Sequence, residues 1–125
     1  MENSRRMEYN VKELTHFFNN IMINLGYYDW TLRIIPNSSE GFCWTKRKII
    51  DIGENVKNPK KLLLHEIAHI GTARFCNNKH NWFFFRKYED LLRKYMPNEN
   101  LDNWELQYLG FLDDFGGYYK LCYED

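Results

Sequence analysis

One short segment of this sequence restricts its structure more than any other: residues 65–69, with the sequence HEIAH. Leucines occupy all three positions of 62–64, directly before it. Asn58 and Pro59 precede the leucines and are typical of a helix start, because asparagine caps the first turn and proline suits its first position. We therefore predict a helix over residues 59–75 that carries both histidines of the segment on one face.

The spacing of these side chains suits a metal ion. Residues four apart lie on one face of a helix, so the imidazoles of His65 and His69 can bind one ion. Glu66 lies at the flank of that face, close to a metal-bound water but outside the ligand set. Zinc lowers the pKa of a bound water towards ~7, and a neighbouring carboxylate can take its proton during attack on a carbonyl. We predict Zn²⁺ as the cofactor and Glu66 as the general base, which later protonates the leaving amine. The alternative is an amphipathic helix with two buried structural histidines.

A third ligand is expected, because catalytic zinc usually has three protein ligands and a water molecule. The nearest candidate is His80, which follows a break in the helical pattern at residues 77–79. A turn there can return its imidazole towards His65 and His69, so we predict these three histidines as the metal ligands. In the longer motif HExxHxxGxxH, the third histidine follows the second by six residues. Phe75 occupies that position here, so the third ligand has to come from elsewhere. The alternative third ligands are carboxylates from later helices: Glu89, Glu99 and Glu105.

The overall composition excludes several classes of protein. The chain has 125 residues, with 17 basic and 17 acidic side chains and a formal net charge of +0. This length predicts one domain over residues 1–125. A balanced charge gives no strong signal for nucleic-acid binding, which depends on a basic surface. No run approaches the ~18–20 apolar residues of a membrane helix, and we expect no secretory signal.

The cysteines indicate a compartment. Cys43, Cys76 and Cys122 are far apart and odd in number. They are typical of free thiols in a reducing environment, not of a disulfide framework or a cysteine-ligated zinc site. We therefore expect a cytoplasmic protein.

The rest of the pattern predicts an α+β domain. Helical periodicity or strand alternation gives a helix at 8–25, a strand at 29–35, a hairpin at 41–52 and helices at 80–95 and near 102–111. This order predicts an N-terminal helix, a small three-stranded antiparallel sheet, the helix of the histidine motif and C-terminal helices.

Three other features have ordinary structural explanations. The basic residues 46–48 are expected to form a solvated hairpin turn. The aromatic residues 82–85 are expected to belong mainly to the core. His16 is expected at the surface.

Several of these segments together resemble one known family. They are Asp29–Arg33, Gly41–Trp44, Ile49–Ile52, Leu62–His69, and His80 with Phe84 four positions later. In this combination the chain is similar to the SprT-like zinc metallopeptidases, a family of small zincins. The resemblance implies a minimal zincin-like fold, zinc ligation by His65, His69 and His80, and catalysis by Glu66. We expect no accessory zinc ribbon or DNA-binding region after residue 96, so the resemblance does not imply the DNA-repair role of larger members.

The zincin comparison also implies a mode of substrate binding. Such enzymes often hold a peptide as an added strand along a sheet edge, which Phe42–Thr45 or Lys48–Ile52 could supply. The alternative is a plain core hairpin. Candidates for stabilising the developing charge on the carbonyl oxygen are Tyr108, Tyr118 and Tyr119. Asp113 and Asp114 could orient a zinc-binding imidazole, although an exposed acidic pair is more often only solvated.

The sequence as a whole predicts a zinc-dependent metallopeptidase. It would hydrolyse a peptide or protein substrate through a zinc-bound water that Glu66 activates. One alternative is a catalytically inactive zinc-binding interaction module of phage or mobile-element origin, and another is a non-proteolytic hydrolase. Glu66 favours catalysis, because a structural zinc site is usually closed by a fourth ligand and has no use for a base. The sequence does not indicate an oligomeric state.

Overall fold

The computed structural model describes residues 2–76, 80, 82–102 and 105. The chain forms two compact units, Met1–Glu66 and Ile67–Asp125, and the boundary between them falls inside a helix. The architecture is α+β, with a small three-stranded sheet in the first unit. No helix in the described part of the chain is both long and apolar enough to span a bilayer.

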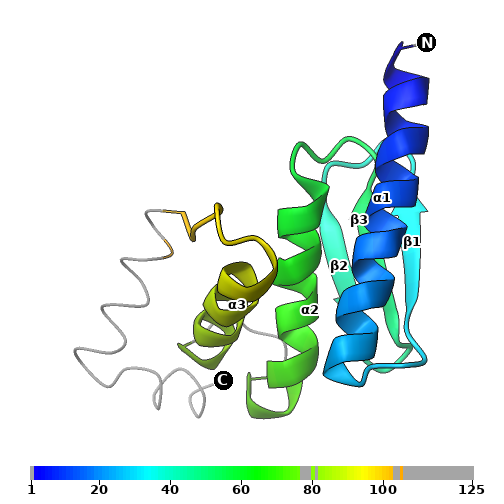
Figure 1. Ribbon diagram of the computed structural model, residues 1–125. Helices are drawn as coiled ribbons and strands as arrows, with labels where there is room; N and C mark the ends of the chain where they lie inside the picture. Colours follow the sequence, from blue (N-terminus) through cyan, green and yellow to red (C-terminus); the bar gives the residue numbers. More distant parts are fainter. Residues whose placement is uncertain (1, 77–79, 81, 103–104, 106–125) are drawn as a thin grey trace. The chain divides into compact units, whose positions relative to one another are not determined.

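The N-terminal unit begins with helix α1, Glu2–Leu25, drawn in blue in Figure 1. It starts six residues before the predicted position 8, since no glycine or proline in the preceding stretch interrupts a helix. Leu14, Phe18 and Ile21 recur at helical spacing and are buried, as their periodicity predicted. The backbone N–H of Gly26 donates to the carbonyl of Ile23 at 3.2 Å and closes the last turn.

Three short strands follow α1. They are β1 (Thr31–Ile35), β2 (Gly41–Trp44) and β3 (Ile49–Gly53), and their order in the sheet is β1-β3-β2. The predicted hairpin is confirmed, because β2 and β3 pair in antiparallel register with Cys43 opposite Ile50. The predicted all-antiparallel sheet is wrong, because β1 pairs with β3 in parallel, with Leu32 opposite Ile50. The sheet is therefore mixed, and β3 is its central strand.

The physical reason for the mixed sheet lies in the link between β1 and β2. This link, residues 36–40, crosses the end of β3 to the opposite edge of the sheet. The N–H of Gly53 donates to the carbonyl of Glu40 at 2.8 Å, and the N–H of Asn55 donates to that of Ser38 at 2.8 Å. A side chain at residue 53 would overlap the carbonyl oxygen of Ser38, so the crossing requires glycine there.

One face of the sheet is covered by α1 and by the first part of α2, which runs from Pro59 to Cys76 (Figure 1). Side chains from α1, from the sheet and from Pro59 line a shared apolar pocket. On this face Cys43, Ile50 and Ile52 are buried. The strand alternation therefore gives the sheet one face packed against helices.

The opposite face carries a polar group that joins all three strands. Asp51 on β3 accepts two hydrogen bonds from the Arg33 guanidinium on β1, at 2.7 and 2.9 Å. It also accepts one from the Trp44 indole N–H on β2, at 2.8 Å. The hydrogen bonds from Arg33, and then that from Trp44, lower the pKa of Asp51 below its ordinary value. Because these bonds require the ionised carboxylate, they link the stability of the sheet to pH.

Replacing Asp51 with asparagine is expected to destabilise the N-terminal unit. We expect the Tm at pH 7 to fall by roughly 4–8 °C, because an amide cannot accept both Arg33 hydrogen bonds and the Trp44 bond. The pKa of Asp51 is lowered on folding, so its stabilisation is present above the unfolded pKa of ~3.9 and lost as pH falls through the folded pKa. Thermal unfolding of wild type and Asp51→Asn at pH 7 and pH 3 measures this effect. The Tm difference between the two proteins should be smaller at pH 3. Asp29→Asn, at an exposed position, is the control.

The C-terminal unit contains the remainder of α2 and helix α3, Trp82–Tyr95. The observed bounds of α2 and α3 agree closely with the predicted helices at 59–75 and 80–95. Phe84 and Phe85 are fully buried, which confirms the prediction that these two aromatic residues belong to the core. The predicted helix near 102–111 lies mostly outside the described residues.

Candidate metal centre

Helix α2 supplies the base of the site. Its start is capped as predicted, because the Asn58 side-chain oxygen accepts the backbone N–H of Lys61 at 3.3 Å. The helix continues without interruption through residues 65–69. His65 and His69 therefore lie one turn apart on the same face, and the helix itself fixes their spacing.

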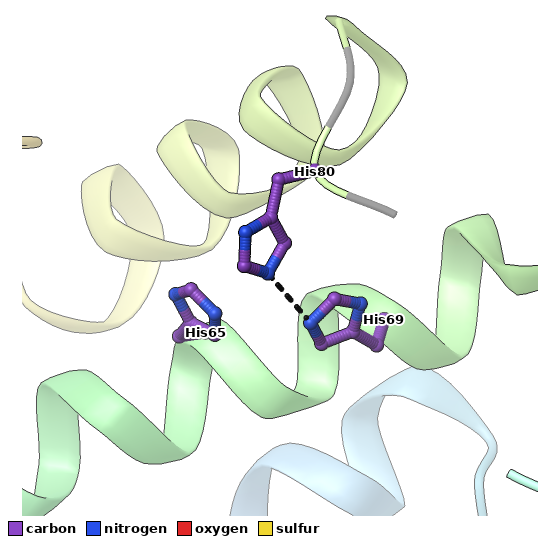
Figure 2. A group of neighbouring side chains, drawn as sticks. All are labelled: His65, His69 and His80. Carbon is purple, nitrogen blue, oxygen red and sulfur yellow. Dashed lines mark hydrogen bonds between the residues drawn. The ribbon is translucent and has the colours of Figure 1, made fainter. Parts of the chain in front are cut away.

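His80 brings a third imidazole to this face. Its Nε2 lies 3.1 Å from Nε2 of His69. Ligand nitrogens from His65, His69 and His80 all lie within 4.8 Å of one another, and Figure 2 shows the three rings turned towards a common point. Within the described residues, these three histidines form the group that can hold a metal ion.

Phe84 supports two of the three rings. Its ring centroid lies 4.5 Å from that of His69 and 4.6 Å from that of His80. Phe84 is fully buried, so it gives both imidazoles a rigid apolar wall. Phe84 lies in the first turn of α3, which begins at Trp82, shortly after His80.

The surroundings of His69 and His80 favour their neutral imidazole forms. Burial, and then the neighbouring His80, lower the pKa of His69 to about 4. Partial burial also lowers the pKa of His80. A neutral imidazole is the form that binds a metal, so His69 needs to lose no proton at neutral pH.

Glu66 lies next to the histidines and outside the group of ligand atoms. Its Oε2 is 4.0 Å from Nε2 of His65, and the residue is only 5% exposed. Burial raises the pKa of this carboxyl from its ordinary value to about 7. A buried carboxylate beside a candidate metal centre matches the position that the sequence predicted for the general base.

Two of the three alternative carboxylate ligands, Glu89 and Glu105, bind other partners. Glu89 on α3 pairs with Arg93 at 2.7 Å and with Arg86 at 3.4 Å. Glu105 accepts the backbone N–H of Asp102 at 2.8 Å, as in a helix-capping interaction. None of Glu89, Glu99 and Glu105 belongs to the group of ligand atoms found among the described residues.

The remaining sequence predictions have mixed outcomes. His16 is exposed on α1, and residues 46–48 form an exposed turn between β2 and β3, as predicted. The suggestion that Lys48–Ile52 could offer a free sheet edge is wrong, because β3 is paired on both sides. The remaining candidates lie outside the described residues: Tyr108, Asp113, Asp114, Tyr118 and Tyr119.

The donor set fits zinc. Zinc binds histidine nitrogens at ~2.0–2.1 Å, so two ligand nitrogens on a tetrahedral ion are separated by ~3.3 Å. The observed separation of 3.1 Å between His69 and His80 is close to this value. Among the described residues the group consists of three imidazoles and no thiolate, which matches the ligand type of open, catalytic zinc sites more closely than that of structural ones.

Replacing His80 with alanine tests the third ligand. We expect the affinity for zinc to fall by at least ~10-fold, because removal of a ligand leaves two imidazoles to hold the ion. Isothermal titration with zinc in a competing chelator measures this change. His16→Ala, which removes an exposed histidine from α1, should leave the affinity unchanged. Equal affinities in wild type and His80→Ala would exclude His80 as a ligand.

Comparison with protein-family models, curated proteins and solved structures gives no match to this chain. The resemblance to SprT-like metallopeptidases therefore stays a prediction from the motif residues. Function is therefore inferred from the chemistry of the site itself.

Gly41, at the start of β2, is a residue whose place at the site the sequence did not reveal. A side chain at this position would meet both Leu62 and Glu66 of α2. In the sequence Gly41 only marks the beginning of a strand. A glycine in a strand often marks a place where another part of the chain comes close. This signal does not identify which helix or strand that is.

Proposed function

We propose that this protein is a zinc-dependent metallopeptidase of the SprT-like type. The observation that carries the proposal is the group of three imidazoles with Glu66 beside it, 4.0 Å from His65 and outside the ligand atoms. A site that only stabilises a fold is usually closed by four protein ligands and needs no adjacent base. This combination therefore favours hydrolysis over a purely structural site.

The residues divide into two roles. His65, His69 and His80 hold the ion, and Phe84 fixes the orientation of two of their rings. When bound, zinc lowers the pKa of a coordinated water and polarises the carbonyl that is attacked. Glu66 would serve as the base at its carboxylate: it would take a proton from the attacking water and return it to the leaving nitrogen.

In the sheet that the described residues form, β2 is an edge strand, and its outer edge is the proposed place for the substrate. β2 lies at the edge of the sheet, and its first residue, Gly41, approaches Oε2 of Glu66. A peptide that pairs with Gly41–Trp44 as an added strand would pass this carboxylate. The substrate class is therefore an extended polypeptide segment, which backbone hydrogen bonds can bind with little dependence on sequence.

Metal removal tests this proposal. The purified chain is incubated with a library of proteome-derived peptides, and mass spectrometry identifies new termini. We expect cleavage by the zinc-loaded protein, loss of cleavage after treatment with 1,10-phenanthroline, and recovery after one equivalent of zinc is restored.

Two results would contradict the proposal. Cleavage that persists without metal would assign the reaction to another site or to a contaminant. Tight binding of one zinc with no cleavage of any peptide would instead favour a zinc-binding interaction module.

A further inference from the structure

The backbone of β2 approaches α2 unusually closely at Gly41. A Cβ atom at this position would lie 2.8 Å from Cδ2 and 3.0 Å from Cγ of Leu62, and 3.2 Å from Oε2 of Glu66. Real Cβ atoms essentially never show separations under 3.0 Å, so a side chain here would make Leu62 shift, and at 3.2 Å the Glu66 carboxylate would have to give by a few tenths of an ångström. Gly41 does not have a positive φ, so the effect of a side chain here comes from space and not from backbone conformation.

The oxygen that faces Gly41 is also the one directed at the histidines. Oε2 of Glu66 lies 4.0 Å from Nε2 of His65. The backbone of Gly41 therefore borders the carboxylate on the side of β2, and a methyl group there would push this oxygen. The other β2 residue directed at the helices, Cys43, is buried and lies near the same carboxylate. Burial, and then the charge of Glu66, raise the pKa of the Cys43 thiol to about 12. At neutral pH the thiol is therefore uncharged.

We infer that Gly41 is a positioning residue for Glu66: its missing side chain lets the β2 backbone hold the carboxylate beside the metal site. This inference rests on the proposed function, in which Glu66 is the base. Catalytic groups must be placed accurately: a displacement of ~1 Å can reduce a rate by ~100-fold, and the shift of a few tenths of an ångström expected for Glu66 is a fraction of that. A methyl group at residue 41 should therefore affect catalysis while the three histidines keep their places.

Binding of acetohydroxamate to the zinc-loaded protein tests this inference without a known substrate. A hydroxamate chelates zinc through two oxygens, and a carboxylate beside the metal accepts its proton in a charge-assisted hydrogen bond. We expect Gly41→Ala to bind zinc with an affinity within ~10-fold of wild type. Its affinity for acetohydroxamate should fall by at least ~10-fold, and so should that of Glu66→Gln. With a cleaved peptide, Gly41→Ala should lower kcat and leave KM nearly unchanged.

Leu62 provides the control for a general packing defect. Leu62→Ala alone should bind acetohydroxamate as wild type does. The double variant Gly41→Ala/Leu62→Ala gives the new methyl group room on the leucine side and keeps its contact with Glu66, so the weakened binding should persist. This double variant also serves if Gly41→Ala alone fails to fold.

Three outcomes would overturn the inference. If Glu66→Gln weakens acetohydroxamate binding and Gly41→Ala does not, Gly41 does not position the carboxylate and the proposed function stands. If Leu62→Ala restores acetohydroxamate binding in the double variant, the contact with Leu62, and not the contact with Glu66, causes the weak binding of Gly41→Ala. If wild type and Glu66→Gln bind equally, Glu66 does not lie beside the metal, and the inference fails together with the proposed function.

Discussion

Replacing Glu66 with glutamine is expected to lower the rate of peptide cleavage by about 100- to 10,000-fold while zinc stays bound. Glutamine has nearly the same shape as glutamate but cannot accept a proton from the attacking water. Glu66 lies outside the group of ligand atoms, so its loss removes no bond to the ion. Because Glu66 supplies no ligand atom and lies 4.0 Å from His65, the expected loss of zinc affinity is smaller than the ~10–100-fold typical when a hydrogen-bond partner of a ligand is removed.

The measurement combines zinc content by mass spectrometry with initial rates on one cleaved peptide. Glu13→Gln is the matched control, because Glu13 lies on α1 and pairs with Lys60 at 2.9 Å, and this substitution should leave the rate unchanged. A Glu66→Gln variant that cleaves as fast as wild type would remove Glu66 from the mechanism. A variant that loses its zinc would show that Glu66 is a ligand.

Replacing His69 with alanine is expected to have the largest effect on metal binding. His69 is only 7% exposed, and its ring contacts both His80 and Phe84. Its loss therefore removes one ligand and the neighbour that orients a second. We expect zinc affinity to fall by at least ~100-fold, or ~2.7 kcal/mol, and cleavage to fall with it.

Thr72→Ala is the control for this substitution. Thr72 is buried on the same helix, and its hydroxyl donates to the carbonyl of Ala68 at 2.9 Å, so the change removes a buried hydrogen bond but no ligand. Competition with a chromogenic zinc chelator measures both variants. Weak zinc binding in His69→Ala with normal binding in Thr72→Ala is the expected pair of results. Equal affinity in wild type and His69→Ala would place the ion elsewhere.

Local signals in the sequence were sufficient to predict most of the elements. Asn58 and Pro59 mark the start of α2, and the basic turn at residues 46–48 marks the connection between two strands. Both features were predictable because capping and turn signals act within a few residues of the chain. The parallel pairing of β1 with β3 was not predicted. It depends on a five-residue link that crosses the end of β3, and nothing in the composition of residues 36–40 separates such a crossing from an ordinary hairpin.

The candidate site shows the same limit. The helix period alone brings His65 and His69 together, so this pair follows directly from the sequence. His80 was one of several candidates, because its approach depends on how the chain returns after α2. The inferred role of Gly41 could not be predicted from the sequence, because it depends on the distance between the backbone of β2 and the side chains of α2.

X-ray absorption at the zinc edge is the sharpest test of the three-histidine site, because it counts and identifies the atoms around the ion. The sample is the full chain loaded with one equivalent of zinc. We expect three imidazole nitrogens at ~2.0–2.1 Å and one further oxygen from water. A spectrum with a sulfur neighbour, or with fewer than three imidazoles, would contradict the assignment of His65, His69 and His80 as the ligands of an open zinc site.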